Sequence, residues 1–305
     1  MDVDRERVVR ALTFWLRPDF LVRCFRRFQV LEGFDRAIAL ASLTFSAIVP
    51  LGIVVSGAVT DHSIGDHLVE RFGLEGNGAR AVQDLFNTGE DLASGFSVFS
   101  FFLLLVTILS FSRALQRLFE RTWELPPLSV RNTKNGLIWI SGLVVYVVVT
   151  GAVRATYNDG VLEILTGVVL AALTVGFVLW SGVTLSNRRI TKRELLPAAI
   201  LVAAVAFVLG IGGDIWVPRL FNSYASRYGA VGAVFALISW LFVLMVGLVA
   251  AVAIGREVSE ELDAIKRGEK PSNEQIQAEW AQVRTQAHEA RQRVSDWRAA
   301  RKQKR

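Results

Sequence analysis

Six long stretches of the sequence contain no aspartate, glutamate, lysine, arginine or histidine. They run over Ala37–Thr60, Leu92–Ser112, Asn135–Val153, Ile164–Asn187, Leu195–Gly213 and Tyr228–Gly255. An α-helix of about 20 mostly apolar residues crosses the hydrocarbon of a bilayer, whereas a surface helix of a soluble protein keeps a polar face. The pattern therefore predicts an all-α integral membrane protein, built as a bundle of six transmembrane helices.

Positively charged residues determine the predicted orientation of this bundle. All but five of the 34 Lys and Arg residues lie before the first stretch, between the second and third, between the fourth and fifth, or after the sixth. Lys and Arg concentrate in the cytoplasmic loops of membrane proteins. We therefore expect both termini in the cytoplasm (N-in, C-in) and a multi-pass location in the cell (inner or plasma) membrane.

Residues 1–36 form the predicted cytoplasmic N-terminal segment. Within it, Asp19–Leu31 carries apolar and basic residues at helical spacing, with Arg23, Arg26 and Arg27 opposite the apolar face. An amphipathic helix of this kind is expected to lie in the headgroup region with its guanidinium groups toward lipid phosphate. A helix packed beneath the bundle is the alternative.

The membrane domain is expected to cover residues 37–255, and residues 256–305 form a basic cytoplasmic tail. From Ser272 onward, apolar residues recur at heptad spacing, which predicts a helix. This 272–305 helix can pair with a second copy of the chain or another partner, lie on anionic lipid, or remain solvated. The sequence leaves these three arrangements open.

Recognisable signatures of catalysis are missing from the sequence. It has no G-x-x-x-x-G-K-[ST] loop for nucleotide phosphates, no H-E-x-x-H and no G-x-S-x-G, and Cys24 is its one cysteine. We therefore expect no enzyme activity, no ATPase, no cofactor and no metal site. Because the basic residues cluster beside the predicted spans, we expect anionic lipid headgroups rather than nucleic acid as partners.

Polar residues beside the spans are candidates for function, because ionisable groups are costly at membrane depth. Pro50 is expected to bend the first span; the bend either borders a polar cavity or is a packing kink whose freed carbonyl bonds with Ser46. Arg113 is expected to anchor the second span at the interface or to bind phosphate. The outer helix ends are expected to form either charge pairs or a headgroup site from Arg154, Asp214, Arg219, Asn222 and Tyr228.

Two parts of the chain contain recognisable motifs. The run ALASLTFSAIVPLGI, with Ser46 and Pro50, resembles the opening motif of a known family, the YihY/BrkB family. The run FNSYASRYGAVGAVFALISWLFVLMVGLVAAVAIGREV resembles its closing motif, with Tyr228–Gly229 opening the last span, Trp240 midway, and Gly255 with Glu257 at the end. Arg256 departs from the family pattern, in which an apolar residue is commoner.

The resemblance covers about residues 20 to 260 and implies a six-helix inner-membrane protein. The family formerly carried the label ribonuclease BN and is now discussed as a lipid or lipid-precursor exporter. We expect no ribonuclease activity, because the acidic residues are not arranged as a metal-binding cluster on the cytoplasmic side.

The favoured function is therefore a transporter or flippase for a lipid or lipid-linked precursor. Its hypothetical substrate path comprises Ser46, Pro50, Arg113, Arg154, Asp214, Arg219, Asn222, Tyr228 and Glu257. The alternative function is a non-transporting membrane scaffold that recruits partners through its basic tail.

Overall fold

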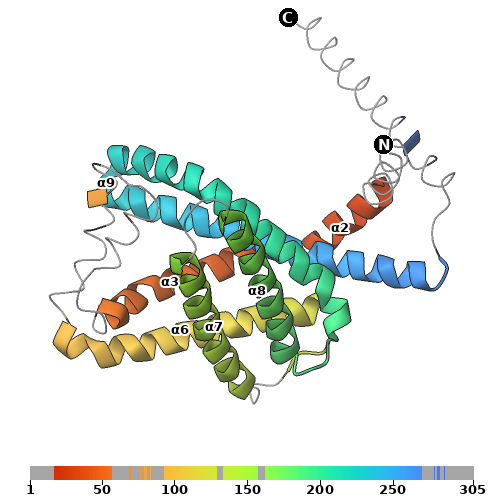
Figure 1. The fold of residues 1–305 in the computed structure, drawn as a ribbon, viewed down its shortest axis with the longest axis horizontal. Coiled ribbons are helices and arrows are strands. Elements are labelled where there is room, and N and C mark those ends of the chain that lie inside the picture. Colours follow the sequence, from red (N-terminus) through yellow and green to blue (C-terminus); the bar gives the residue numbers. More distant parts are fainter. Residues whose placement is uncertain are drawn as a thin grey trace, which may run out of the picture. The chain divides into compact units, whose positions relative to one another are not determined.

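The computed structural model describes residues 17–56, 93–128, 133–156 and 162–269, with the single positions 69, 76, 79, 80, 83, 278, 280, 281 and 285. These residues form α-helices joined by turns, with no strand among them. The helices are α2 (Pro18–Val30), α3 (Gly33–Ser56), α6 (Ala93–Thr122), α7 (Thr133–Thr156), α8 (Leu162–Leu185) and α9 (Lys192–Lys266) (Figure 1). The all-α prediction is confirmed for the described residues, while the predicted 272–305 helix lies outside them apart from four positions.

Contacts divide the chain into two units. One comprises Phe28–Ser259, which we call the membrane unit, and the other comprises Met1–Arg27 with Glu260–Arg305, which we call the terminal unit. The terminal unit is thus assembled from both ends of the chain.

Five described segments are long and apolar enough to cross a membrane. They are Phe99–Thr122, Lys134–Val153, Thr166–Leu185, Lys192–Gly213 and Val231–Lys266, and they correspond to the second to sixth predicted spans. The first predicted span falls on α3 as far as Ser56, and its last residues, 57–60, lie outside the described part. The structure therefore has the helices of a multi-pass membrane protein, and the count of six spans stays a prediction.

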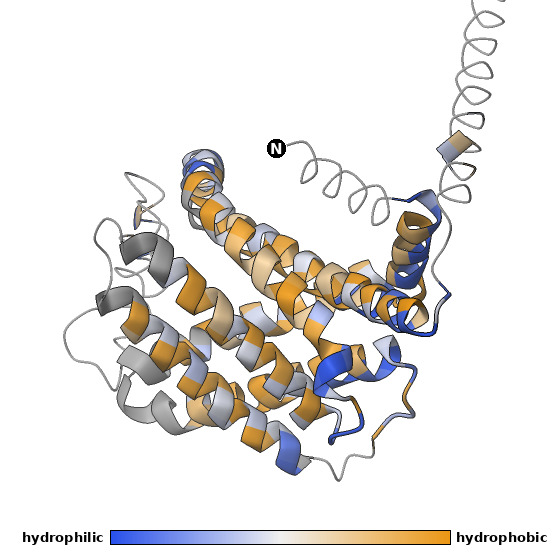
Figure 2. Cartoon of the chain, turned by 45° about the vertical axis from the view of Figure 1, so that its right-hand side comes forward, coloured by the Kyte–Doolittle hydropathy of each residue, from blue (hydrophilic) through white to orange (hydrophobic). Residues whose placement is uncertain are grey.

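The long helices expose many large apolar side chains. Large apolar side chains on them are open to the surroundings, for example Phe102 at 62%, Val148 at 63% and Val208 at 64% exposure. Hydrophobic residues continue along most of the length of the long helices (Figure 2). A water-soluble protein rarely leaves such large apolar patches uncovered, so these exposed faces are consistent with helices of a multi-pass membrane protein.

Helix α9 is longer than the hydrophobic pattern predicts. Residues 214–227, expected to connect the fifth and sixth spans, continue the helix as far as Tyr228. At Gly229 the backbone adopts φ 58° and ψ −139°, and the chain turns back as a second helical arm (Figure 1). Such a conformation is open to glycine and costly for other residues, which explains where α9 breaks.

Packing between the two arms of α9 explains why the polar stretch stays helical. Val217, Phe221 and Ala225 of the first arm are buried in one cluster with Ala233 and Ala236 of the second. Helix stability in proteins comes mainly from packing of one face rather than from intrinsic propensity. The expectation of a connection over 214–227 is therefore corrected to a helical hairpin.

Glycine allows the two arms of α9 to approach closely at both ends. A Cβ atom on Gly232 would overlap the carbonyl of Tyr224, and one on Gly255 would overlap the backbone of Ala198. Small residues at such contacts let membrane helices meet backbone to backbone. A side chain at Gly232 or Gly255 would therefore push the two arms of the hairpin apart.

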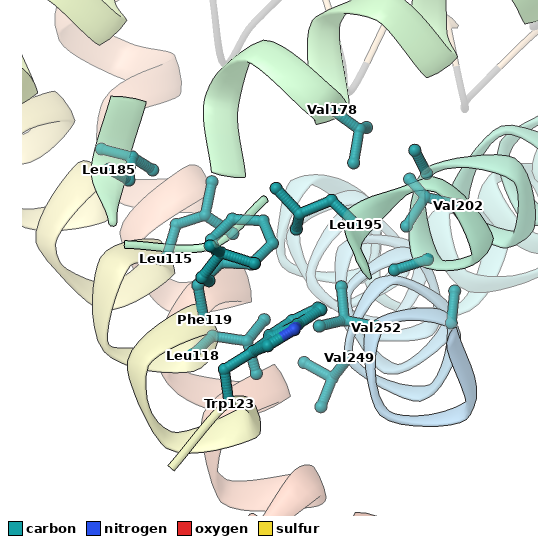
Figure 3. Close-up of a cluster of buried hydrophobic side chains, with 14 of the residues drawn as sticks. Leu115, Leu118, Phe119, Trp123, Val178, Leu185, Leu195, Val202, Val249 and Val252 are labelled. Atoms are coloured by element: carbon teal, nitrogen blue, oxygen red, sulfur yellow. The ribbon is translucent and has the colours of Figure 1, made fainter. Parts of the chain in front are cut away.

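The main core of the membrane unit contains side chains of α3, α6, α7, α8 and α9, and Figure 3 shows its part between α6, α8 and α9. Side chains from the three helices point toward one another in Figure 3, including Leu118, Phe119, Leu185, Leu195, Val249 and Val252, each at most 2% exposed. Dispersion contacts in a close-packed interior are weak singly and large in sum. This cluster joins the end of α6 to both arms of α9.

Hydrogen bonds between side chains join α7 to α8 at membrane depth. Trp139 Nε1 donates to Ser181 Oγ at 2.9 Å, and the hydroxyls of Tyr146 and Thr174 are 2.9 Å apart. Interhelical bonds of this kind contribute about 0.6 kcal/mol each in a membrane protein. These four polar side chains are therefore paired between the two helices.

Candidate functional site

Ionisable residues meet where α3 begins and α6 ends. Arg121 Nη1 lies 3.2 Å from Glu32 Oε2, which links the end of α6 to the turn before α3. Arg189 Nη2 lies 2.8 Å from Glu120 Oε1, which brings the α8–α9 connection to the same end. We call the end of the membrane unit defined by Glu32, Glu120, Arg121, Arg189 and Arg256 the basic end.

The basic end contains residues from each of the four segments that are rich in Lys and Arg and are predicted to lie on the cytoplasmic side. Arg256, after the last predicted span, lies with its guanidinium carbon 5.7 Å from the ring centroid of Trp123 at the end of α6. Two predicted spans separate each of these segments from the next, which would place all four on the same side of a membrane. The arrangement of the described helices agrees with that pattern.

Glu120 is the most enclosed charge of the basic end, with 3% of its side chain exposed. Its Oε1 accepts hydrogen bonds from Arg189 at 2.8 Å, from Gln116 Nε2 at 2.9 Å and from the backbone N–H of Leu128 at 3.0 Å. A buried carboxylate costs several kcal/mol of desolvation unless it is paired and hydrogen-bonded. The three donors meet that requirement.

Arg189 also fixes the two chain segments beside it. Its Nη1 donates to the carbonyl of Pro126 at 2.6 Å, and its Nε donates to the carbonyl of Ser186 at 2.9 Å. One guanidinium therefore connects the α6–α7 connection, the α8–α9 connection and Glu120. The sequence did not reveal the Glu120–Arg189 pair because the two residues are 69 positions apart. In the sequence, Arg189 is one of several basic residues in the connection between the fourth and fifth predicted spans.

Glu257 is the second enclosed acid of the basic end, at 6% exposure. Its neighbour Arg256 is partly buried over the Trp123 ring, which is cation–π geometry. The sequence singled out Glu257 through its family motif and Arg256 as a departure from it. The structure places both at the same end as the Glu120–Arg189 pair.

The other predicted site residues do not form one group in the described structure. Arg113 is exposed on α6, and Arg219 and Tyr228 are exposed on the first arm of α9. Asn222 is partly buried, and its Oδ1 is enclosed without a hydrogen-bond partner among the described residues. The side chains of Arg154 on α7 and Asp214 on α9 lie outside the described part, so the predicted outer mouth stays a prediction.

Pro50 lies inside α3 with its side chain buried, and the predicted bend of the helix at this residue stays a prediction. The hydroxyl of Ser46 donates to the carbonyl of Ser42 at 2.8 Å. Proline at position 50 lacks the N–H that would bond to the carbonyl of Ser46 itself. The expectation that the Ser46 hydroxyl meets that freed carbonyl is wrong, because the hydroxyl bonds one turn earlier.

Arginines of α2 bind glutamates at the end of α9 within the terminal unit. Arg23 Nη2 lies 2.6 Å from Glu261 Oε2, Arg27 Nη2 lies 2.8 Å from Glu260 Oε2, and Arg17 also binds Glu261. Glu261 is 5% exposed. Arg23 and Arg27 therefore bind carboxylates of the chain itself, and the prediction that the guanidinium groups of α2 face lipid phosphate stays a prediction.

These observations define a multi-pass α-helical membrane protein with ionisable side chains enclosed at one end of its helices. The sequence profile of the family described as Virulence factor BrkB matches residues 24–276. The chain belongs to that family, which confirms the resemblance seen in the sequence.

Relatives of the chain are named membrane proteins. A UPF0761 membrane protein of Xanthomonas campestris pv. campestris (strain B100) is 23% identical over 256 residues, which are 77% of this chain and 59% of the relative. One of Xanthomonas axonopodis pv. citri (strain 306) is 23% identical over 259 residues, with 77% and 60% covered. The chain thus spans about three fifths of these relatives. No solved structure matches.

Proposed function

We propose that this chain is a six-span inner-membrane transporter or flippase for a lipid or lipid-linked precursor, with no ATPase of its own. It is proposed to have both termini in the cytoplasm, no enzyme activity and no resident cofactor. In this proposal, the basic end lies in the cytoplasmic leaflet, because Lys and Arg concentrate on that side of membrane proteins.

The enclosed charges of the basic end are the observation that carries this proposal. Glu120 and Glu257 are at most 6% exposed, and Arg189 and Arg256 are partly buried beside Glu120 and Trp123 respectively. Ionisable groups held inside membrane bundles are costly and commonly mark the path of a polar substrate. A lipid headgroup is polar and charged, so these groups suit its entry from the adjoining leaflet.

Lipid exchange by the full chain in liposomes tests the proposal. We expect faster leaflet exchange of fluorescent phosphatidylglycerol than in protein-free liposomes, read by quenching the outer-leaflet label. Arg256→Gln should slow exchange about fivefold, the effect of losing one arginine that attracts an anionic headgroup. Arg256→Lys, which keeps the charge, should retain most of the rate.

Arg193→Gln is the matched control, because Arg193 is an exposed arginine near the start of α9. It should leave the exchange rate unchanged. Protein-free rates for labelled phosphatidylglycerol, phosphatidylethanolamine and a glycolipid alike would contradict the transport proposal, as would equal losses in Arg256→Gln and Arg193→Gln.

The terminal unit favours a second function, a scaffold. Ion pairs of Arg23 and Arg27 with Glu261 and Glu260 hold the N-terminal helix to the region where the C-terminal tail begins. A unit built from both chain ends can present the 272–305 part of the basic tail to a partner without taking part in lipid transport.

Deletion of residues 272–305 separates the two functions. If the tail pairs two copies, the full chain in detergent should be a dimer by light scattering, and the truncated chain a monomer with unchanged lipid exchange. The same oligomeric state before and after truncation would contradict pairing between copies. Loss of lipid exchange on truncation would contradict a separate scaffold role.

A further inference from the structure

One exposed face of α6 changes from apolar to basic along the helix. Phe102 and Val106 are 62% and 43% exposed, and Arg113, Arg117 and Arg121 follow at helical spacing, also exposed. Residues three or four positions apart lie on one helix face. This face therefore presents an apolar surface followed by three arginines.

Helix α3 adds a fourth arginine at the basic end. The side chain of Arg36 is 15% exposed, and its Nε donates to the carbonyl of Leu31 at 2.5 Å. Burial, followed by the nearby charge of Arg121, lowers the pKa of Arg36. The charge of Arg117 also lowers the pKa of Arg36, so Arg117 and Arg121 both lie close enough to Arg36 to repel it.

Arg36 and Arg121 share one carboxylate. Glu32 lies 3.2 Å from Arg121 and 3.8 Å from Arg36. Glu120, on the same helix as Arg121, is enclosed with Arg189. Arg117 is exposed on α6 one turn before Arg121, so it adds a further positive charge beside this pair.

We propose that Arg36, Arg117 and Arg121 bind the phosphate of an anionic phospholipid, whose acyl chains lie along the exposed apolar face of α6. Charge complementarity supports the phosphate, because guanidinium groups bind phosphate oxygens through charge-assisted hydrogen bonds. The apolar surface next to the arginines supports a lipid over free phosphate. The site holds a resident lipid, and it does not depend on the transport proposal.

Lipid binding to the purified full chain tests the site. The chain is stripped of lipid in detergent and titrated with phosphatidylglycerol or phosphatidylcholine, and bound lipids are counted by native mass spectrometry. We expect phosphatidylglycerol to bind more tightly than phosphatidylcholine. The double variant Arg117→Gln/Arg121→Gln should weaken phosphatidylglycerol binding about 30-fold, the combined effect of two arginines near an anionic headgroup.

Two further variants separate the site from general charge and from misfolding. Lys192→Gln/Arg193→Gln removes the same charge from exposed residues at the start of α9 and should leave binding unchanged. Arg117→Lys/Arg121→Lys should keep the preference for phosphatidylglycerol. Equal affinity for both lipids, equal losses in the two Gln double variants, or full competition by millimolar inorganic phosphate would each overturn the proposal.

Discussion

Replacing Arg189 with alanine is expected to lower the free energy of unfolding by about 3 kcal/mol. The substitution leaves the carboxylate of Glu120, 3% exposed, without its cation at 2.8 Å. It also removes the donors to the carbonyls of Pro126 and Ser186. The measurement is an SDS titration in mixed micelles, followed by tryptophan fluorescence.

Arg188→Ala is the matched control for this prediction, because Arg188 is the adjacent arginine and is exposed. It should change stability by less than about 0.5 kcal/mol. A second comparison isolates the buried charge: Glu120→Gln combined with Arg189→Ala should be more stable than Arg189→Ala alone. Equal destabilisation by the two alanine variants would show that Arg189 contributes no more than a surface charge.

Gly255→Ala is expected to destabilise the protein by about 2 kcal/mol, because the added methyl group has no space. A Cβ at this position would overlap the backbone of Ala198, so the two arms of α9 would have to separate. Backbone atoms, unlike the end of a long side chain, have no other rotamer to adopt. The same SDS titration measures the loss, and a lower melting temperature in detergent should accompany it.

Gly176→Ala separates this steric effect from the general effect of alanine in a helix. Gly176 lies within α8, and nothing lies within 4 Å of an added Cβ. Alanine at a free helical position stabilises by about 0.5–1 kcal/mol relative to glycine. The two glycine variants should therefore change stability in opposite directions, and a similar loss in both would contradict close contact at Gly255.

Hydrophobic continuity predicted the spans well because a membrane requires it over the whole length of a helix. The stretch Asn135–Val153 lies inside α7, and Ile164–Asn187 overlaps nearly all of α8. The pattern failed over 214–227, where polar residues interrupt it. There Val217 and Phe221 pack on Ala233, a contact that forms only after the chain turns back at Gly229.

The candidate site was partly predictable for a similar reason. Glu257 stood out because it belongs to a recognisable motif, whereas Glu120 and Arg189 belong to none. Neighbours in sequence with equal charge, Arg188 and Arg189, differ completely in structure, since one is exposed and the other binds a buried carboxylate. Local sequence contains no information that separates such a pair.

The sequence by itself determined that this chain is helical, multi-pass and basic at alternate connections, because these properties depend on solvent and on runs of neighbouring residues. The tertiary structure alone decided which charges are enclosed, where α9 turns back, and which arginines gather beside α3 and α6. Those features depend on contacts between helices far apart in the chain, and close packing selects them residue by residue.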